Sequence, residues 1–120
     1  MTVQNEINDH LLLWDQFIRH AREAGLKAAR SEAEYKRDRA KFVAWYKATN
    51  PGASQVAAES AADANETLHV RRVARLSDDA EVEACRMRNQ WFRAKSEALR
   101  SEKVDERESS RLYADNPAGA

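Results

Sequence analysis

One interruption organises this chain. The segment at residues 49–54, TNPGAS, combines a proline that cannot continue a helix, a glycine with a permissive backbone, and a serine that can cap a new helix. Apart from Gly25, residues 4–48 contain neither proline nor glycine, and residues 55–114 contain neither. So few turn-forming residues exclude an all-β domain with regularly spaced turns. The sequence therefore predicts an all-α protein with two long helical arms.

The breaks also predict the organisation of the chain. We expect a single helical domain over residues 1–116, with arm one at 4–48, a turn at 49–54 and arm two at 55–114. A second proline starts a flexible tail at residues 117–120. No stretch of 18 apolar residues and no secretory signal pattern is present in these residues, so we expect a cytoplasmic protein without a membrane span.

Each arm carries an apolar stripe at helical spacing. The sequence of arm two allows a kink or a break near residues 76–79, because serine and aspartate favour the first positions of a helix. The predicted stripe of arm two consists of Val70, Val73, Ala80, Ala84, Met87, Trp91, Ala94 and Ala98, with Leu76 beside it. The predicted stripe of arm one consists of Ile7, Leu11, Trp14, Ile18, Ala21, Gly25, Ala28, Tyr35, Phe42 and Tyr46.

Neither arm can bury its stripe alone, so we expect an antiparallel, coiled-coil-like helical hairpin. Folding about the turn pairs positions whose numbers sum to about 103, which places Leu11 against Phe92 and Trp14 against Asn89. Two helices bury only one face each, and a second copy would complete the core as a four-helix homodimer. The alternative is a short third helix formed by the end of arm two.

The widest apolar surface lies near the start of arm one and the facing part of arm two. Excess apolar width on a helix favours self-association or a protein partner. The predicted face consists of Leu11, Leu12, Leu13, Trp14, Phe17, Ile18, Met87, Trp91 and Phe92.

The residues that usually carry chemistry do not converge in the sequence. The three histidines, His10, His20 and His69, follow no metal-binding spacing, and we expect them at the surface or at an interface. Cys85 is the only cysteine, and we expect it to be a semi-buried small residue. No glycine-rich phosphate loop and no acid–base pair occurs. We therefore predict no enzyme activity, no cofactor, no metal site and no catalytic residue.

Net charge is zero, yet the charges are unevenly distributed. Residues 19–47 hold nine basic and four acidic side chains. Cations interleaved with aromatic residues suit single-stranded nucleic acid, because phosphates meet the cations and bases stack on the rings. The aromatic residues also belong to the predicted core, so contact with nucleic acid is possible but not favoured. The candidate contacts are Lys36, Arg37, Arg39 and Lys41.

Three segments carry a resemblance to a known class. Residues 41–47 (KFVAWYK) end the first charged helix, residues 54–59 (SQVAAE) begin the second arm, and residues 98–102 (ALRSE) lie toward its end. This layout resembles small helical-hairpin proteins encoded in the early regions of tailed bacteriophages, beside replication or recombination genes. The resemblance covers most of the chain. It implies a role in the cytoplasm of the infected bacterium and supplies no catalytic residues.

These observations predict a non-catalytic helical assembly or adaptor protein, an accessory factor in bacteriophage DNA replication or recombination. One alternative is a single-stranded nucleic-acid-binding protein that uses the basic flank. Another is an inhibitor that docks on a host protein through residues 11–18.

Overall fold

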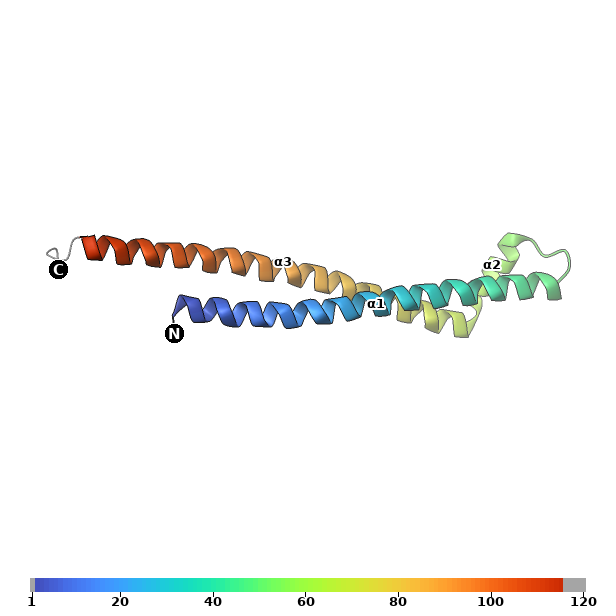
Figure 1. Ribbon diagram of the computed structural model, residues 1–120. Coiled ribbons are helices and arrows are strands. Elements are labelled where there is room, and N and C mark those ends of the chain that lie inside the picture. Colours follow the sequence, from blue (N-terminus) through green and yellow to red (C-terminus); the bar gives the residue numbers. More distant parts are fainter. Residues whose placement is uncertain (1, 116–120) are drawn as a thin grey trace. The chain divides into compact units, whose positions relative to one another are not determined.

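The computed structural model describes residues 2–115, which form three helices (Figure 1). Helix α1 spans Val3–Thr49, α2 spans Gln55–Ala64 and α3 spans Glu66–Asp115. The described residues contain no β-strand, so the predicted all-α class is confirmed. No helix among them is long and apolar enough to cross a membrane. The predicted tail at residues 117–120 lies outside the described part of the chain.

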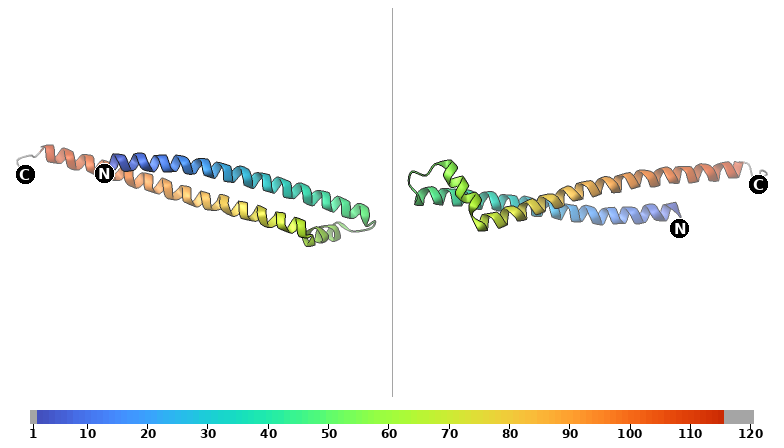
Figure 2. Two further views of the ribbon diagram at one scale, coloured as in Figure 1. Left: turned by 90° about the horizontal axis from the view of Figure 1, so that it is seen from below. Right: turned by 180° about the vertical axis from the view of Figure 1, so that it is seen from behind.

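The chain divides into two compact units, each built around helices that run antiparallel (Figure 2). Unit 1 comprises Met1–His20 and Cys85–Ala120, so it pairs the first part of α1 with the later part of α3. Unit 2 comprises Ala21–Ala84, where the rest of α1 returns through α2 into the first part of α3. Both units therefore join segments that are distant in the sequence.

Local capping interactions explain where the chain turns in unit 2. Gly52 has a φ of 90°, a backbone conformation that other residues rarely adopt. Ser54 Oγ accepts a hydrogen bond from the backbone N–H of Ala57 at 3.1 Å, which caps α2 as expected. Asn65 separates α2 from α3, and its Oδ1 accepts from the backbone N–H of Leu68 at 3.0 Å. The second helical break therefore lies at Asn65.

The helix break that the sequence allows near residues 76–79 does not occur, because α3 continues through them without interruption. Asp78 does not cap a helix start. Its carboxylate accepts a hydrogen bond from Ser31 Oγ on α1 and lies 3.5 Å from Lys27 Nζ. The Asp78 carboxylate is thus bound by side chains of the opposite helix and does not accept hydrogen bonds from the N–H groups of a new helix start. These tertiary contacts explain why the local N-cap signal does not produce a helix start.

The predicted apolar stripe of α3 is also wrong, because all of its residues are exposed. In unit 2 the half-buried or buried residues of α3 are instead Leu68, Arg72, Arg75, Asp78 and Val82. In unit 1 they are Cys85, Asn89, Phe92, Ser96, Leu99 and Lys103. These positions recur at intervals of three and four residues, as in a coiled-coil seam. Many are polar, so hydrophobicity alone could not identify the face.

The stripe predicted for α1 is partly confirmed. Ile7 and Trp14 are covered in unit 1, and Ala28 and Tyr35 are buried in unit 2. In unit 1 the seam continues through His10 and Phe17, whereas Leu11 and Ile18 are exposed. At two positions of the predicted stripe, the covered residue is therefore the one that precedes the predicted residue in the sequence: His10 in place of Leu11, and Phe17 in place of Ile18.

That one-residue difference also decides the predicted pairing of the helices. Trp14 Nε1 donates a hydrogen bond to Asn89 Oδ1 at 2.8 Å, so the pairing of these two residues is confirmed. The predicted pairing of Leu11 with Phe92 is wrong, because His10 contacts Phe92 and Leu11 is exposed.

Candidate functional site

Unit 1 contains an aromatic cluster, defined as His10, Trp14, Phe17, Trp91 and Phe92. Phe92 lies at its centre, with only 4% of its surface exposed. The ring of Phe17 stacks on it at a centroid distance of 5.2 Å, and the Trp14 ring is nearly parallel to it at 6.3 Å. The indole of Trp91 meets it edge-on at 4.9 Å. Contacts of this kind stabilise beyond the apolar area they bury, so the cluster anchors α1 to α3 within unit 1.

His10 is the buried polar member of this cluster. Its Nε2 lies 2.9 Å from the backbone oxygen of Phe92, and because that oxygen can only accept, Nε2 carries the proton. Its Nδ1 has no hydrogen-bond partner among the described residues. The expectation of a surface or interface histidine is wrong for His10, which is 3% exposed. Its spacing from Ile7 and Trp14, three and four residues, is the signal that could have placed it in the core.

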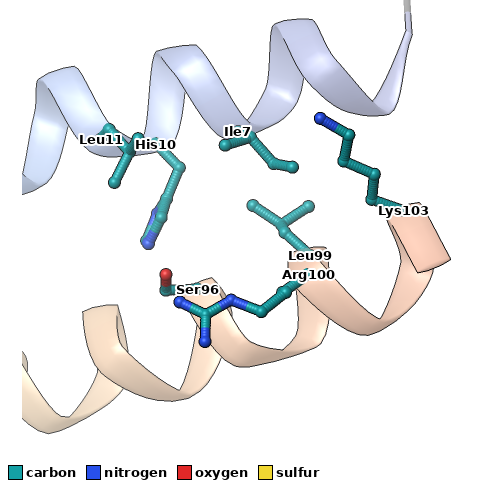
Figure 3. A pocket seen from close by; sticks show the side chains of 7 residues that line it. All are labelled: Ile7, His10, Leu11, Ser96, Leu99, Arg100 and Lys103. Carbon is teal, nitrogen blue, oxygen red and sulfur yellow. The ribbon is translucent and has the colours of Figure 1, made fainter.

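A recess of about 250 Å³ opens beside His10 between the two helices of unit 1 (Figure 3). Three of its seven lining side chains are aliphatic, and two are cations of α3. Lys103 Nζ donates a hydrogen bond to Gln4 Oε1 of α1. Such a recess suits an apolar group that carries an anionic end. The lining residues are Ile7, His10, Leu11, Ser96, Leu99, Arg100 and Lys103.

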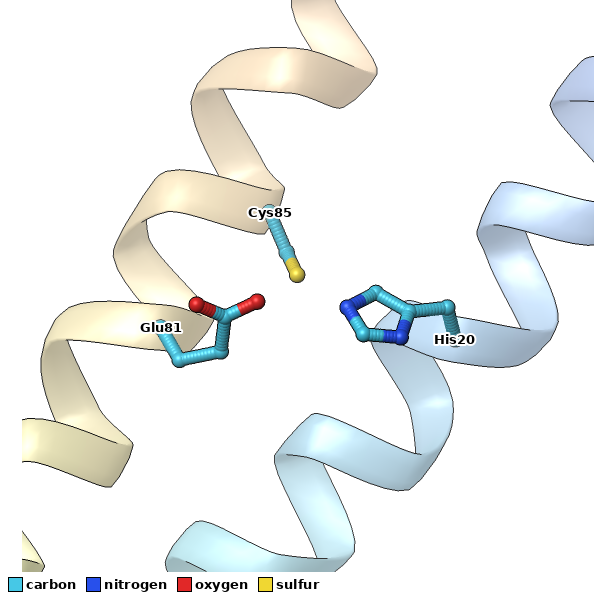
Figure 4. A group of neighbouring side chains, drawn as sticks. All are labelled: His20, Glu81 and Cys85. Carbon is cyan, nitrogen blue, oxygen red and sulfur yellow. The ribbon is translucent and has the colours of Figure 1, made fainter.

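Unit 1 also brings His20 of α1 close to Cys85 of α3 (Figure 4). A ring nitrogen of His20 and the Cys85 sulfur lie within 4.8 Å of each other. Cys85 is buried and His20 is exposed. Imidazole nitrogen and thiolate sulfur are common zinc ligands, but a zinc site normally takes three or four protein ligands. The pair cannot be recognised in the sequence, because the two residues are far apart along the chain and only the antiparallel packing brings them together.

The predicted interaction face separates into two groups. Trp14 and Phe17 are half-buried and Phe92 is buried, all within the aromatic cluster of unit 1. The other six side chains are exposed, with exposed fractions from 49% to 65%. These are Leu11, Leu12, Leu13, Ile18, Met87 and Trp91.

The predicted nucleic-acid contacts lie in unit 2, where most of them have carboxylate partners. Lys36 Nζ is 2.8 Å from Glu32 Oε1, and Arg39 Nη2 is 3.4 Å from Asp63 Oδ1 on α2. Arg37 is exposed, and its Nε lies 3.6 Å from Asp38 Oδ1. The fourth candidate, Lys41, is also exposed.

The aromatic residues that alternate with these cations divide between the core and the surface. Tyr35 is buried, Phe42 is half-buried, and Trp45 is exposed. Two of the three rings therefore serve the packing of unit 2 and are not open to stacking bases.

Glu32 gives a prediction about pH. The hydrogen bond from Lys36, the charge of Lys36 and the charge of Arg75 all lower the pKa of Glu32. A lowered pKa in the folded state stabilises the protein above the unfolded-state pKa, and this stabilisation is lost as pH falls through the folded-state value. We expect Glu32→Gln to lower the urea midpoint slightly at pH 7 and to match the unmodified protein in strong acid. An equal deficit at both pH values would contradict this origin.

No protein family, curated protein or solved structure matches the chain significantly.

Proposed function

We propose that this protein is a non-catalytic helical assembly or adaptor protein, and that unit 1 docks on a second copy of the chain. The docking surface is the leucine face of α1, defined as Leu11, Leu12 and Ile18, which lie within about 120° of one another around the helix. The observation that carries the proposal is that these three large aliphatic side chains, all within eight residues, are each about half exposed or more. An isologous contact would place the same face on both copies and cover it twice.

The interior of the chain supports the same conclusion. Among the described residues, no large side chain is completely buried, so the intramolecular core is thin. Covering the exposed half of an aliphatic side chain is worth roughly 1 kcal/mol. The leucine faces of two copies together would therefore contribute several kcal/mol to assembly. The resemblance to bacteriophage early proteins extends the proposal to an accessory factor that supports DNA replication or recombination in the host cytoplasm.

A pair of matched substitutions tests the assembly. Leu12 and Leu26 lie on α1, are both 59% exposed, and are separated by two heptads, so they occupy the same position around the helix. We expect Leu12→Glu to convert a concentration-dependent dimer into a monomer in sedimentation velocity. Leu26→Glu, which lies in unit 2, should leave the dimer intact.

Circular dichroism provides the control that both variants remain helical. A monomeric unmodified protein at high concentration would overturn the proposal. Equal dissociation by the two substitutions would overturn the assignment to the leucine face.

A further inference from the structure

Basic side chains clearly outnumber acidic ones in one segment of α3. Residues 86–103 contain six basic and two acidic side chains. All of them belong to unit 1. The basic side chains are Arg86, Arg88, Arg93, Lys95, Arg100 and Lys103.

Carboxylates pair with several cations of unit 2, although Arg22, Arg30, Lys41 and Lys47 have none within 4.0 Å among the described residues. In unit 2, Arg71 Nη1 lies 2.5 Å from Asp38 Oδ2, and Arg75 Nη2 lies 3.5 Å from Glu32 Oε1. Lys27, Lys36 and Arg39 also have carboxylates within 4.0 Å. In unit 1, no carboxylate among the described residues lies within 4.0 Å of four of the cations. These are Arg88, Arg93, Lys95 and Arg100.

An exposed tryptophan stands among these unpaired cations. Trp91 is 51% exposed, while its edge-on contact with Phe92 holds the indole against the core. The Arg88 guanidinium carbon lies 5.9 Å from the Trp91 ring centroid, and Lys95 Nζ lies 5.2 Å from it. Because the spacings of three and four residues place neighbours on one helix face, the three side chains form a continuous surface. We call Arg88, Trp91 and Lys95 the cationic tryptophan face.

We propose that the cationic tryptophan face binds single-stranded nucleic acid. A half-exposed indole can stack on an unpaired base when the two cations beside it turn toward the adjacent phosphates. The bases of a duplex are stacked on one another, so their faces are not available to the indole. This inference is independent of the proposed dimer, because it rests on α3 and not on the leucine face of α1.

The segment has the length of a short site. From Arg88 to Lys95 the helix rises roughly 10 Å, enough for about two extended nucleotides. Base stacking and phosphate contacts are available in both single-stranded DNA and RNA. The probes are therefore labelled oligothymidine and oligouridine of about 15 nucleotides, measured by fluorescence anisotropy with the full chain.

Two double charge reversals give a matched comparison. Arg88→Glu with Lys95→Glu, and Lys36→Glu with Lys41→Glu, change the net charge by the same amount. We expect the first pair to weaken binding at least about tenfold and the second to change it less than about threefold. Trp91→Ala should weaken binding about tenfold while helix content stays constant. Raising salt from about 50 to 200 mM should weaken binding of the unmodified protein.

Several results would overturn the inference. Equal loss from the two charge reversals would show attraction by general charge only. A duplex of the same length that binds as tightly as the single strands would exclude base stacking. Absence of oligonucleotide binding together with binding to anionic vesicles would identify a membrane surface as the ligand. A preference between the two single-stranded probes would identify DNA or RNA as the ligand and support the inference.

Discussion

Phe92→Ala is expected to lower the free energy of unfolding by about 3–5 kcal/mol, the usual cost of removing a buried phenyl ring. Phe92 is 4% exposed and is surrounded by the other four rings of the aromatic cluster. Its removal takes away the ring on which Phe17 stacks and opens a cavity between α1 and α3 in unit 1. Urea unfolding followed by circular dichroism measures the change.

Met87→Ala is the matched control for this prediction. Met87 lies on the same helix but is 65% exposed, so truncating it should change the free energy of unfolding by less than about 0.5 kcal/mol. Similar small effects for both variants would contradict the role of Phe92 as the centre of the unit 1 core. A larger loss for Met87→Ala than for Phe92→Ala would show that the helix faces the other way.

Ala58→Leu is expected to destabilise unit 2 by about 1–3 kcal/mol, because overpacking a close-packed position forces its neighbours to move. The side chains of α2 that face inward are Ala58 and Ala62, which are 0% and 1% exposed. A helix of ten residues is not stable alone in water, so α2 should unfold if it cannot dock. Thermal unfolding measures the loss, and hydrogen exchange over residues 55–64 locates it.

The neighbouring alanine supplies the comparison for this substitution. Ala57 is exposed on the same helix, and Ala57→Leu should leave both stability and hydrogen exchange nearly unchanged. Faster exchange in α2 for Ala58→Leu alone would confirm that the small side chain is required for docking. If the two variants exchanged alike, packing of α2 through Ala58 would be ruled out.

The helical class and the main turn could be predicted from local chemistry. Proline cannot continue a helix, Gly52 adopts a positive φ, and Ser54 caps α2, all through interactions within a few residues. The break at Asn65 was not predicted, although an asparagine is a good cap. Asp78 is an equally good N-cap residue by its type. Only its contacts with the opposite helix show that Asp78 belongs inside α3.

The buried face of α3 could not be predicted from hydrophobicity. A helix of this kind has two sides with similar apolar character, and the more apolar of the two is the exposed one. The buried side carries polar residues such as Arg75, Asp78 and Asn89, which find partners on α1. Burial of such groups is favourable only when their hydrogen bonds and charges are satisfied, a condition that depends on the second helix.

The candidate sites follow the same division. The exposed leucine face was recognisable from its excess apolar width near the start of α1. The cationic tryptophan face was not, because paired and unpaired cations look alike in a sequence. Local residue chemistry thus determined by itself that the chain is helical and where its main turn lies. Only the tertiary structure decided which faces are buried, which histidine enters the core and which cations remain unpaired, because each depends on groups brought together from distant parts of the chain.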